Sequence, residues 1–500
     1  MGLAKDLKGA SRLGVLVAIS AATVGVIYGY DSSNIGGALL YLKETYHLSE
    51  AKAGLVASIV VFGEIAGALV GGRLADRFGR KPVMVGVAAT FALFSLMSAL
   101  AWDIPSLMVA RFLLGLTIGV SVVVVPVFVA ESAATAIRGA LLVLYQVATV
   151  TGIILGYVIA MILAQVIGGA TDAGAGDTWR WLLGLAAIPG VLVTLLLLRL
   201  PDTARWYVMH GRRAEAERVM TQIDPNADVV RELDDLEAEF RSGASLTLTQ
   251  GLRKMFTGKY LRASIFVIGL GFFVQITGIN AVVYYGPQIF EAMGVESDIA
   301  KLGLSALVQV FGLLAVFGSM AIVDRAGRRP ILLTGIGVMI AANVLLIVTF
   351  LNGTEKGDTV TLGGSLTVLA FIGLVLFVAG FTLGFGALVW VYAGESFPSD
   401  LRSLGSSAML TSDLVANVIV GLVTLQMLKA WGGSGTFMFF GAMAVLAFLF
   451  IAKLAPETKG RPLDDVRHYW ENGGSWPVES APSTGTATGP TVVAGRPDQD

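Results

Sequence analysis

The amino-acid sequence predicts an all-α integral membrane protein in which twelve transmembrane helices form two pseudo-symmetric bundles of six. Three observations lead to this prediction. The composition is 55% hydrophobic and 14% charged, with a mean hydropathy of +0.75, which soluble domains rarely reach. Twelve apolar stretches are long enough to cross a bilayer, and three short motifs in the first half of the chain return in the same order in the second half.

The twelve apolar stretches give the order of the helices. A hydrocarbon core about 30 Å thick requires roughly 20 apolar residues for each helical crossing. We expect crossings at residues 13–41, 52–74, 82–101, 106–130, 139–167, 180–200, 261–291, 301–323, 331–351, 364–394, 404–428 and 436–455. The first stretch is too long for a signal-peptide core, and no small-residue cleavage site closes it, so we expect a helix of the mature protein.

Basic residues predict the orientation in the membrane. One set of loops holds few of the 35 Lys and Arg residues, namely Lys43, Lys52, Lys301, Lys356 and Lys429, and most of the others lie in the opposite set. Since basic loops remain cytoplasmic, we expect both termini in the cytoplasm and the chain in the plasma or inner membrane. The net charge of −1 gives no reason to expect a nucleic-acid partner.

The motif repeats divide the chain into halves. DRFGRKP at 76–82 returns as DRAGRRP at 324–330, AESAATAIRG at 130–139 as GESFPSDLRS at 394–403, and PDT at 201–203 as PET at 456–458. Each copy follows its original by six crossings, and such parallel repeats are the plan of major facilitator transporters. We expect an N-terminal bundle at 1–200, short cytoplasmic linker helices at 201–260, a C-terminal bundle at 261–467 and a disordered cytoplasmic tail at 468–500, which is rich in Gly, Pro, Ser and Thr.

Five motifs carry a family resemblance. They are GRLADRFGRK (72–81), PDTARW (201–206), QITGINAVVYYGP (275–287), GESFPSDLR (394–402) and PETKGRPLDDV (456–466). In combination, over roughly residues 13–467, the chain resembles the sugar porter family of the major facilitator superfamily, which includes bacterial proton-coupled sugar symporters and glucose facilitators. The resemblance implies a transporter of a monosaccharide or similar polyol that works by alternating access, and we expect it to be monomeric in the bilayer.

An acid lies inside the first crossing, in the stretch GYDSSNIGG at 29–37. An acid in mid-membrane costs about 2.5–3.5 kcal/mol, so Asp31 should face a cavity and have a partner. Arg111 in the fourth crossing is the best candidate; at the cytoplasmic mouth it would instead be only a topology anchor, with Asp31 facing the outer vestibule. The resemblance implies proton coupling, because both residues match proton-coupled sugar porters, whereas passive members tend to carry a neutral residue in place of Asp31. We expect Asp31 to bind a proton outside and to release it inside when Arg111 approaches.

A sugar site needs amides and aromatic rings that converge on a cavity. Gln275 and Asn280 are about 140° apart on an ideal helix, so they meet one ligand only if the helix is interrupted, which Gly278 permits. Further candidates are Gln146, Tyr284, Tyr285, Phe381 and Trp390. From the residues alone the aromatic side chains could equally be packing or interfacial residues. The resemblance implies sugar contacts for Gln146, Gln275, Asn280 and Trp390.

The chain departs from hexose porters at several of these positions. Val274, Gly312, Ala387 and Leu414 stand where the family commonly has Gln, Asn, Pro and Trp. Each lost hydrogen bond costs about 0.5–1.5 kcal/mol, so a standard glucose site would be weak. Glucose or xylose is the default substrate, and another polyol, a modified sugar or a less polar metabolite stays open.

Two further acids lie within crossings. Glu64, in VFGEIAGALVGG at 61–72, is either a hydrogen-bonded structural residue beside glycines spaced by four or a second proton or substrate site. Asp413, in MLTSDLVAN at 409–417, is either a hydrogen-bonded residue that faces water or its own bundle or a contact for substrate or an ion, and we favour the contact. It would suit a ligand with a basic group or additional hydroxyls.

Charged residues also gather at the cytoplasmic helix ends, namely Asp76, Arg77, Arg80, Glu131, Arg138, Asp324, Arg328, Glu395 and Arg402. They could be a solvated cluster that sets topology, in which surface pairs contribute about 0–1 kcal/mol each. The resemblance favours a cytoplasmic latch between the halves that holds while the outer side is open and breaks on rocking.

Other functions have less support in the sequence. Uncoupled sugar diffusion is the nearest alternative, and a nutrient sensor that signals through its tail is a remote one. An enzyme is not expected, because the chain has no Cys and no His or acidic cluster with catalytic or metal-binding spacing. We therefore expect no catalytic residue, no metal and no cofactor.

Overall fold

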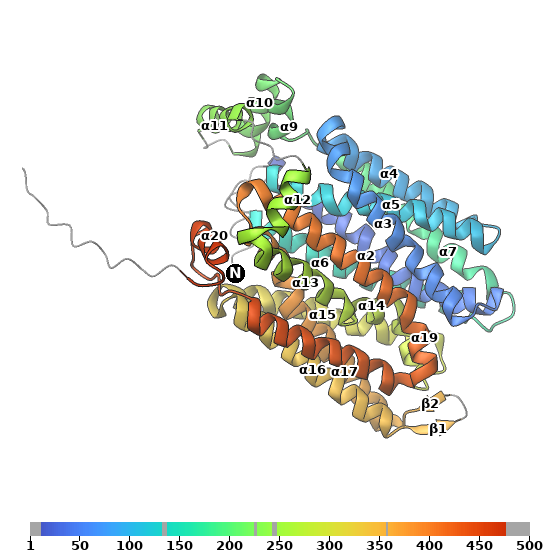
Figure 1. Ribbon diagram of the computed structural model, residues 1–500. Helices are drawn as coiled ribbons and strands as arrows, with labels where there is room; N and C mark the ends of the chain where they lie inside the picture. The colour runs from blue at the N-terminus through green and yellow to red at the C-terminus, as the bar shows by residue number, and fades with distance from the viewer. Residues whose placement is uncertain (1–11, 133–137, 225–227, 243–247, 357–358, 477–500) are drawn as a thin grey trace, which may run out of the picture.

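The computed structural model describes the chain apart from residues 1–11, 133–137, 225–227, 243–247, 357–358 and 477–500 (Figure 1). Ten of its helical segments are long and apolar enough to cross a bilayer. One of them, within α19 (Ser399–Leu454), contains two crossings, because the chain changes direction at Gly432, where φ is +65°. With α2 (Arg12–Tyr46), which holds the apolar stretch 13–41, the described crossings number twelve, and the predicted fold is confirmed.

The N-terminal bundle is formed by α2 and the helices that follow it: α3 (Glu50–Phe78), α4 (Arg80–Ala99), α5 (Ile104–Ser132), α6 (Arg138–Val166), the 3-10 turn η1 (Ala175–Asp177), α7 (Thr178–Leu185) and α8 (Ala187–Leu197). Its most extensive contacts join α2 to α6 and α3 to α5. Glycine makes the first of these possible, since a Cβ atom on Gly29 would lie 1.9 Å from the carbonyl oxygen of Thr149. The backbone beside Asp31 is thereby fixed against α6.

The C-terminal bundle repeats this plan with interrupted helices. It contains α13 (Leu261–Ile276), α14 (Ile279–Ala292), α15 (Asp298–Ala326), α16 (Arg328–Leu351), α17 (Gly364–Phe381), the π-helical turn η3 (Thr382–Gly386), α18 (Ala387–Glu395) and α19. Two of its crossings are broken: α13 from α14 at Gly278, and α17 from α18 by η3. Interrupted helices free polar groups for binding, and in membranes they are tolerated where they line a cavity or are buried in protein.

Among the described residues, the most extensive contacts between the two bundles join α6 with α15, α3 with α19 and α2 with α14. Figure 1 shows the blue N-terminal helices and the yellow-to-red C-terminal helices as two neighbouring groups with parallel long axes. Small residues bring the bundles together, since a Cβ atom on Gly36 of α2 would lie 2.6 Å from the carbonyl oxygen of Tyr284 on α14.

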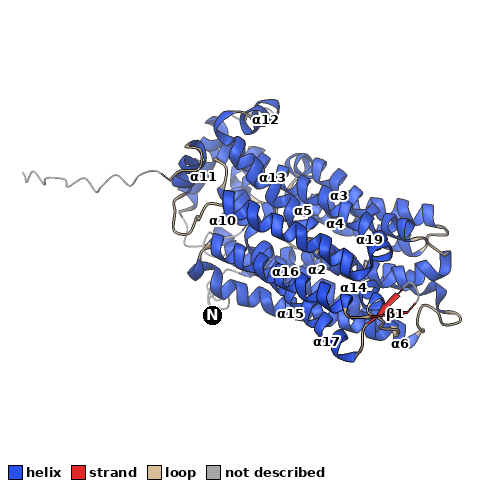
Figure 2. Cartoon of the chain, turned by 60° about the horizontal axis from the view of Figure 1, so that its bottom comes forward, coloured by secondary structure: helices blue, strands red, loops and turns tan. Residues whose placement is uncertain are grey.

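Short helices gather at one end of the molecule, which we call the linker end. They are α9 (Ala204–Met209), α10 (Arg213–Ile223), α11 (Val229–Ser242), α12 (Leu248–Phe256), the 3-10 turn η2 (Gly258–Tyr260) and α20 (Leu463–Glu471). Figures 1 and 2 show them at the end opposite a small antiparallel hairpin, β1 (Thr354–Lys356) and β2 (Thr359–Thr361), in which Thr354 pairs with Thr361. An all-α prediction did not foresee this hairpin in the loop after α16.

The tail prediction needs a correction at its start. We assigned residues 468–500 to a disordered tail, but residues 468–471 belong to α20. Trp470 is fully buried and stacks on Phe266 of α13 with ring centroids 5.5 Å apart, and Glu471 accepts a hydrogen bond from Tyr260. The apolar side chains of α20 thus have a surface to pack on, which composition alone did not reveal. Residues 477–500 lie outside the described residues.

Candidate functional site

Asp31 and Arg111 form a buried ion pair between α2 and α5. The guanidinium donates from Nη1 to Oδ1 of Asp31 at 3.0 Å and from Nη2 to Oδ2 at 3.3 Å. The two side chains are 5% and 1% exposed. This is the forked arrangement in which arginine binds a carboxylate most strongly. Arg111 is therefore a partner of Asp31 inside the bundle, not a side chain at the membrane surface.

Amide and hydroxyl groups of the C-terminal bundle form a second cluster. Asn280 donates to Oδ1 of Asn417 at 2.9 Å and to the Tyr284 hydroxyl at 3.3 Å, and Asn417 donates to the same hydroxyl at 3.0 Å. Close by in sequence, Gln275 donates to Oδ2 of Asp413 at 3.4 Å. We call the set of Gln275, Asn280, Tyr284, Asp413 and Asn417 the amide cluster.

The break at Gly278 gives Gln275 and Asn280 their positions. α13 ends at Ile276, Gly278 has φ +101°, and α14 begins at Ile279. A left-handed residue at this point is cheap only for glycine. The predicted interruption of this helix is confirmed.

Asn417 is a member of the cluster that the sequence analysis missed. It is fully buried on α19 and bridges Asn280 and Tyr284. A signal was present, because Asn417 follows Asp413 by four residues and so shares its helix face.

The remaining residues predicted to contact sugar lie outside the amide cluster. Tyr285 is fully buried and donates to the carbonyl oxygen of Gly421 at 2.5 Å, which makes it a packing contact between α14 and α19. Gln146 approaches the other half: a Cβ atom on Gly386 would lie 3.8 Å from its Nε2 and 3.9 Å from the Phe381 ring. Trp390 is 50% exposed on α18. Among the described hydrogen bonds, none links Trp390 to the amide cluster.

The ion pair and the amide cluster are electrostatic neighbours. Tyr284 of the amide cluster interacts with the charges of Asp31 and Glu64. Tyr28 of α2 interacts with Glu64 in its own half and with Asp413 in the other. The amide cluster therefore lies within electrostatic range of Asp31 and Glu64.

Within the described residues, no group of three or more His, Cys, Asp and Glu side chains has a metal-binding arrangement. The acids near the site lie on three separate helices: Asp31 on α2, Glu64 on α3 and Asp413 on α19.

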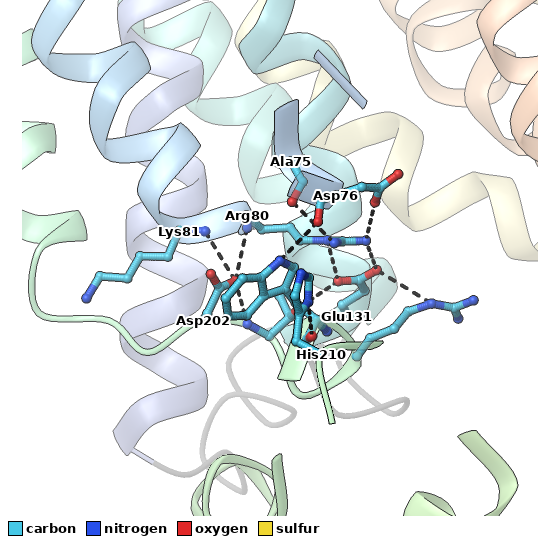
Figure 3. Close-up of polar contacts among 10 residues, drawn as sticks. Ala75, Asp76, Arg80, Lys81, Glu131, Asp202 and His210 are labelled. Atoms are coloured by element: carbon cyan, nitrogen blue, oxygen red, sulfur yellow. Dashed lines mark hydrogen bonds and ion pairs between the residues drawn. The ribbon is translucent and has the colours of Figure 1, made fainter. Parts of the chain in front are cut away.

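The charged motifs at the linker end form a cluster inside the N-terminal half (Figure 3). Arg80 pairs with Asp76 at 3.0 Å and with Glu131 at 3.0 Å, and Glu131 also accepts from the Thr203 hydroxyl at 2.7 Å. Arg205 approaches Glu131 at 3.9 Å. The cluster ties the ends of α3, α4 and α5 to the start of the linker.

The repeated PDT and PET motifs cap helices. Asp202 accepts hydrogen bonds from the backbone N–H groups of Arg80 and Lys81 at the start of α4, at 3.0 and 3.3 Å. Glu457 does the same for Arg328 and Arg329 at the start of α16, at 3.1 Å each. An anion at a helix N-terminus satisfies donors that have no partner within the helix. Burial raises the pKa of Asp202, and the backbone donors act in the opposite direction.

The described members of the predicted latch do not pair across the halves. Asp76, Arg80 and Glu131 pair within the N-terminal half, and Arg77 lies over the ring of its neighbour Phe78. Arg328, Glu395 and Arg402 form no ion pair with described residues of the N-terminal half. The side chains of Arg138 and Asp324 lie outside the described residues. The latch stays a prediction.

Hydrogen bonds do join the halves at the end opposite the linker. Gln288 of α14 donates to the carbonyl oxygen of Gly36 at 3.1 Å, and the backbone N–H of Ala170 donates to Asp298 at 2.8 Å. Tyr157 of α6 donates to the carbonyl oxygen of Val283. The structure is therefore closed between the halves at this end.

Known proteins resemble the chain along nearly its whole length. The family model described as "Sugar (and other) transporter" matches residues 17–470. The arabinose-proton symporter of Bacillus subtilis is 32% identical over 91% of this chain and 95% of its own length, and the galactose-proton symporter of Escherichia coli K12 is 32% identical over 90% and 93%. The xylose transporter XylE of E. coli, in a partially occluded inward-open conformation, superposes with a TM-score of 0.77 at 24% identity over 90% of this chain and all of the other. The chain is a member of the sugar porter family of the major facilitator superfamily.

Proposed function

We propose that this protein imports a monosaccharide or a similar polyol together with a proton, by alternating access between its two halves. The observation that carries the proposal is the Asp31–Arg111 pair, buried next to the amide cluster. Ionisable residues inside a membrane are costly and mark substrate or proton pathways. Here the acid and the polar cluster are close enough to influence each other.

Asp31 supplies the proton chemistry. With Arg111 bound, its carboxylate is stabilised in the ionised form; when a proton binds, the pair loses its attraction and the guanidinium is released. The coupled cycle therefore needs Asp31 to meet the outer solution without Arg111 and the inner solution with it. Rocking of the halves would expose Asp31 to one solution at a time, and protonation would set its pairing with Arg111.

The amide cluster supplies the sugar site. Asn280 and Asn417 each carry donors and an acceptor, and Tyr284 carries a hydroxyl that can do both, which suits a ligand with several hydroxyl groups. The named relatives support a sugar: one symporter takes arabinose, one takes galactose, and XylE is a xylose transporter. An aldose is therefore the first substrate to test.

The orientation and organisation of the chain are part of the proposal. We infer a multi-pass protein of the plasma or inner membrane with the linker end and both termini in the cytoplasm, because basic residues concentrate there. Residues 1–200 and 261–467 would be the two rocking halves, 201–260 the linker and 472–500 the tail, and one chain would suffice for transport.

Proteoliposomes test the function. The purified protein should accumulate a labelled aldose or polyol against its gradient when the outside is acidic, and the accumulation should collapse when a proton ionophore abolishes the pH gradient. An uncoupled facilitator would equilibrate the sugar at the same rate with and without the gradient. Absence of saturable uptake for every sugar and polyol in the screen would reject the proposal in favour of another metabolite or a sensor.

A further inference from the structure

A second buried carboxyl group lies within electrostatic range of the Asp31–Arg111 pair. Glu64 of α3 is 2% exposed and interacts electrostatically with Asp31, Asp413 and Arg111. The other titratable groups that interact with Glu64 are the hydroxyls of Tyr28, Tyr145 and Tyr284. Among these described groups, Arg111 is the cation. It can balance one carboxylate at a time, and in this structure it balances Asp31.

Two buried atoms of this cluster lack hydrogen-bond partners. Oε2 of Glu64 has no donor, and Nε of Arg111 has no acceptor. An unsatisfied buried polar group costs about 1–3 kcal/mol, and more when it is charged. A carboxyl oxygen without a donor and a guanidinium nitrogen without an acceptor are complementary, so the two residues are suited to pair in another state of the protein.

The helix packing directs Arg111 toward α3. Arg111, Gly115 and Gly119 follow each other at intervals of four, so they share one face of α5. Cβ atoms on Gly115 and Gly119 would lie 1.9 Å and 2.0 Å from the carbonyl oxygens of Val60 and Glu64. The face of α5 that carries Arg111 is therefore the face that lies against α3, and the Glu64 backbone packs on this face at Gly119, two turns along the helix from Arg111.

We propose that Glu64 is the second anion of Arg111: when Asp31 takes up a proton from the outer solution, the guanidinium passes to Glu64, whose own proton leaves to the inner solution. The exchange is balanced. One O–H bond forms on Asp31 as one breaks on Glu64, and Arg111 faces one carboxylate before and after. Asp413, which accepts a hydrogen bond from Gln275 and is only partly buried, takes no part.

This exchange explains how the buried Arg111 keeps an ion-pair partner when Asp31 is protonated. Leaving a charge unpaired inside a protein is strongly destabilising. With Glu64 present, protonation of Asp31 leaves no lone guanidinium, so it does not incur this cost. The inference rests on the proposed proton coupling for its role in transport, whereas the sharing of Arg111 between two acids can be tested without transport.

A thermal-stability cycle on the full-length protein in detergent tests the sharing. Asp31→Asn alone should lower Tm moderately, since Arg111 can turn to Glu64. Asp31→Asn with Glu64→Gln should lower Tm by more than the sum of the single changes, and adding Arg111→Gln should restore much of the loss. In the matched control, Asp31→Asn with Asp413→Asn should be additive.

Each result of this cycle decides the proposal. Additive losses for Asp31→Asn and Glu64→Gln would overturn it, as would equal coupling in the Asp413 control. If the double variant does not fold, recovery of a folded protein on adding Arg111→Gln supports the proposal, and failure to recover overturns it.

A transport measurement tests the consequence for protons. The external pH for half-maximal sugar uptake should shift by at least about one unit to the acid side in Glu64→Gln, a tenfold rise in the proton concentration required. Glu64→Asp, which keeps a carboxylate, should return the profile toward the parent. An unshifted profile in Glu64→Gln would overturn the proposed proton exchange. If the parent protein shows no sugar uptake at all, the proposed function fails while the stability cycle still reports on Arg111.

Discussion

Arg111 binds Asp31 through two parallel hydrogen bonds of 3.0 and 3.3 Å, and thereby ties the fourth crossing to the first inside the N-terminal bundle. The pair lies within one half of the molecule, so rocking of the halves does not need to break it. Its state can instead change by protonation, and the amide cluster of the other half lies near enough to respond. Under the proposed function, the proton and the sugar would be separate ligands of neighbouring sites.

Asp31→Asn should uncouple transport. The amide keeps the size of the side chain but cannot lose or gain a proton, so accumulation driven by a pH gradient should disappear. Exchange of labelled for unlabelled sugar should continue, because it needs no net proton movement. Both are measured in proteoliposomes, with Asp103→Asn as a control acid at the start of α5 outside the membrane interior. Gradient-driven accumulation by Asp31→Asn would show that another group couples transport.

Asn417→Ala should weaken sugar binding. The change removes a donor and an acceptor from the amide cluster, and hydrogen bonds contribute about 0.5–1.5 kcal/mol each, so we expect roughly a tenfold rise in Kd. Calorimetric titration of the purified protein measures it. Asn343→Ala is the control, since Asn343 is equally buried but bonds only the carbonyl oxygen of Met339 in its own helix. Equal Kd values for Asn417→Ala and the parent would remove Asn417 from the site.

The overall fold could be predicted because its causes are local. Length and hydropathy predict the crossings, and the repeated motifs predict two halves. The interruption of the helix between Gln275 and Asn280 was also predictable, since Gly278 is the residue that tolerates a left-handed backbone conformation.

Contacts between distant segments were harder to predict. The pairing of Asp202 with the start of α4 depends on how the linker folds back, and the sequence offered only a repeated triplet. To predict the contact between Asn417 and Asn280, one must know how α14 and α19 are aligned against each other. The pattern of residues within one helix does not give this alignment. For Tyr285 the sequence left sugar contact and packing equally open, and its hydrogen bond to the carbonyl oxygen of Gly421 on α19 favours packing.

Gly278→Ala should destabilise the C-terminal bundle. Alanine at φ +101° costs roughly 1–2 kcal/mol, and its Cβ would lie 2.7 Å from the Phe440 ring. We expect a lower Tm in detergent and weaker sugar binding, because Gln275 and Asn280 flank the break. Gly337→Ala, on α16 with no atom within 4 Å of its Cβ, is the matched control and should keep or raise Tm. A Tm for Gly278→Ala equal to that of the control would mean that the break does not depend on glycine.

Gly36→Val should prevent the halves from closing at the end opposite the linker. Even a Cβ atom at this position would lie 2.6 Å from the carbonyl oxygen of Tyr284, and a branched side chain requires α2 and α14 to separate, which also breaks the hydrogen bond from Gln288 to Gly36. Because transport requires this end to close after sugar enters, we expect binding to persist while uptake and exchange are lost. Gly72→Val provides the comparison, since no atom lies within 4 Å of its Cβ position on α3. Normal exchange by Gly36→Val would show that the contact between α2 and α14 is not a closure that transport requires.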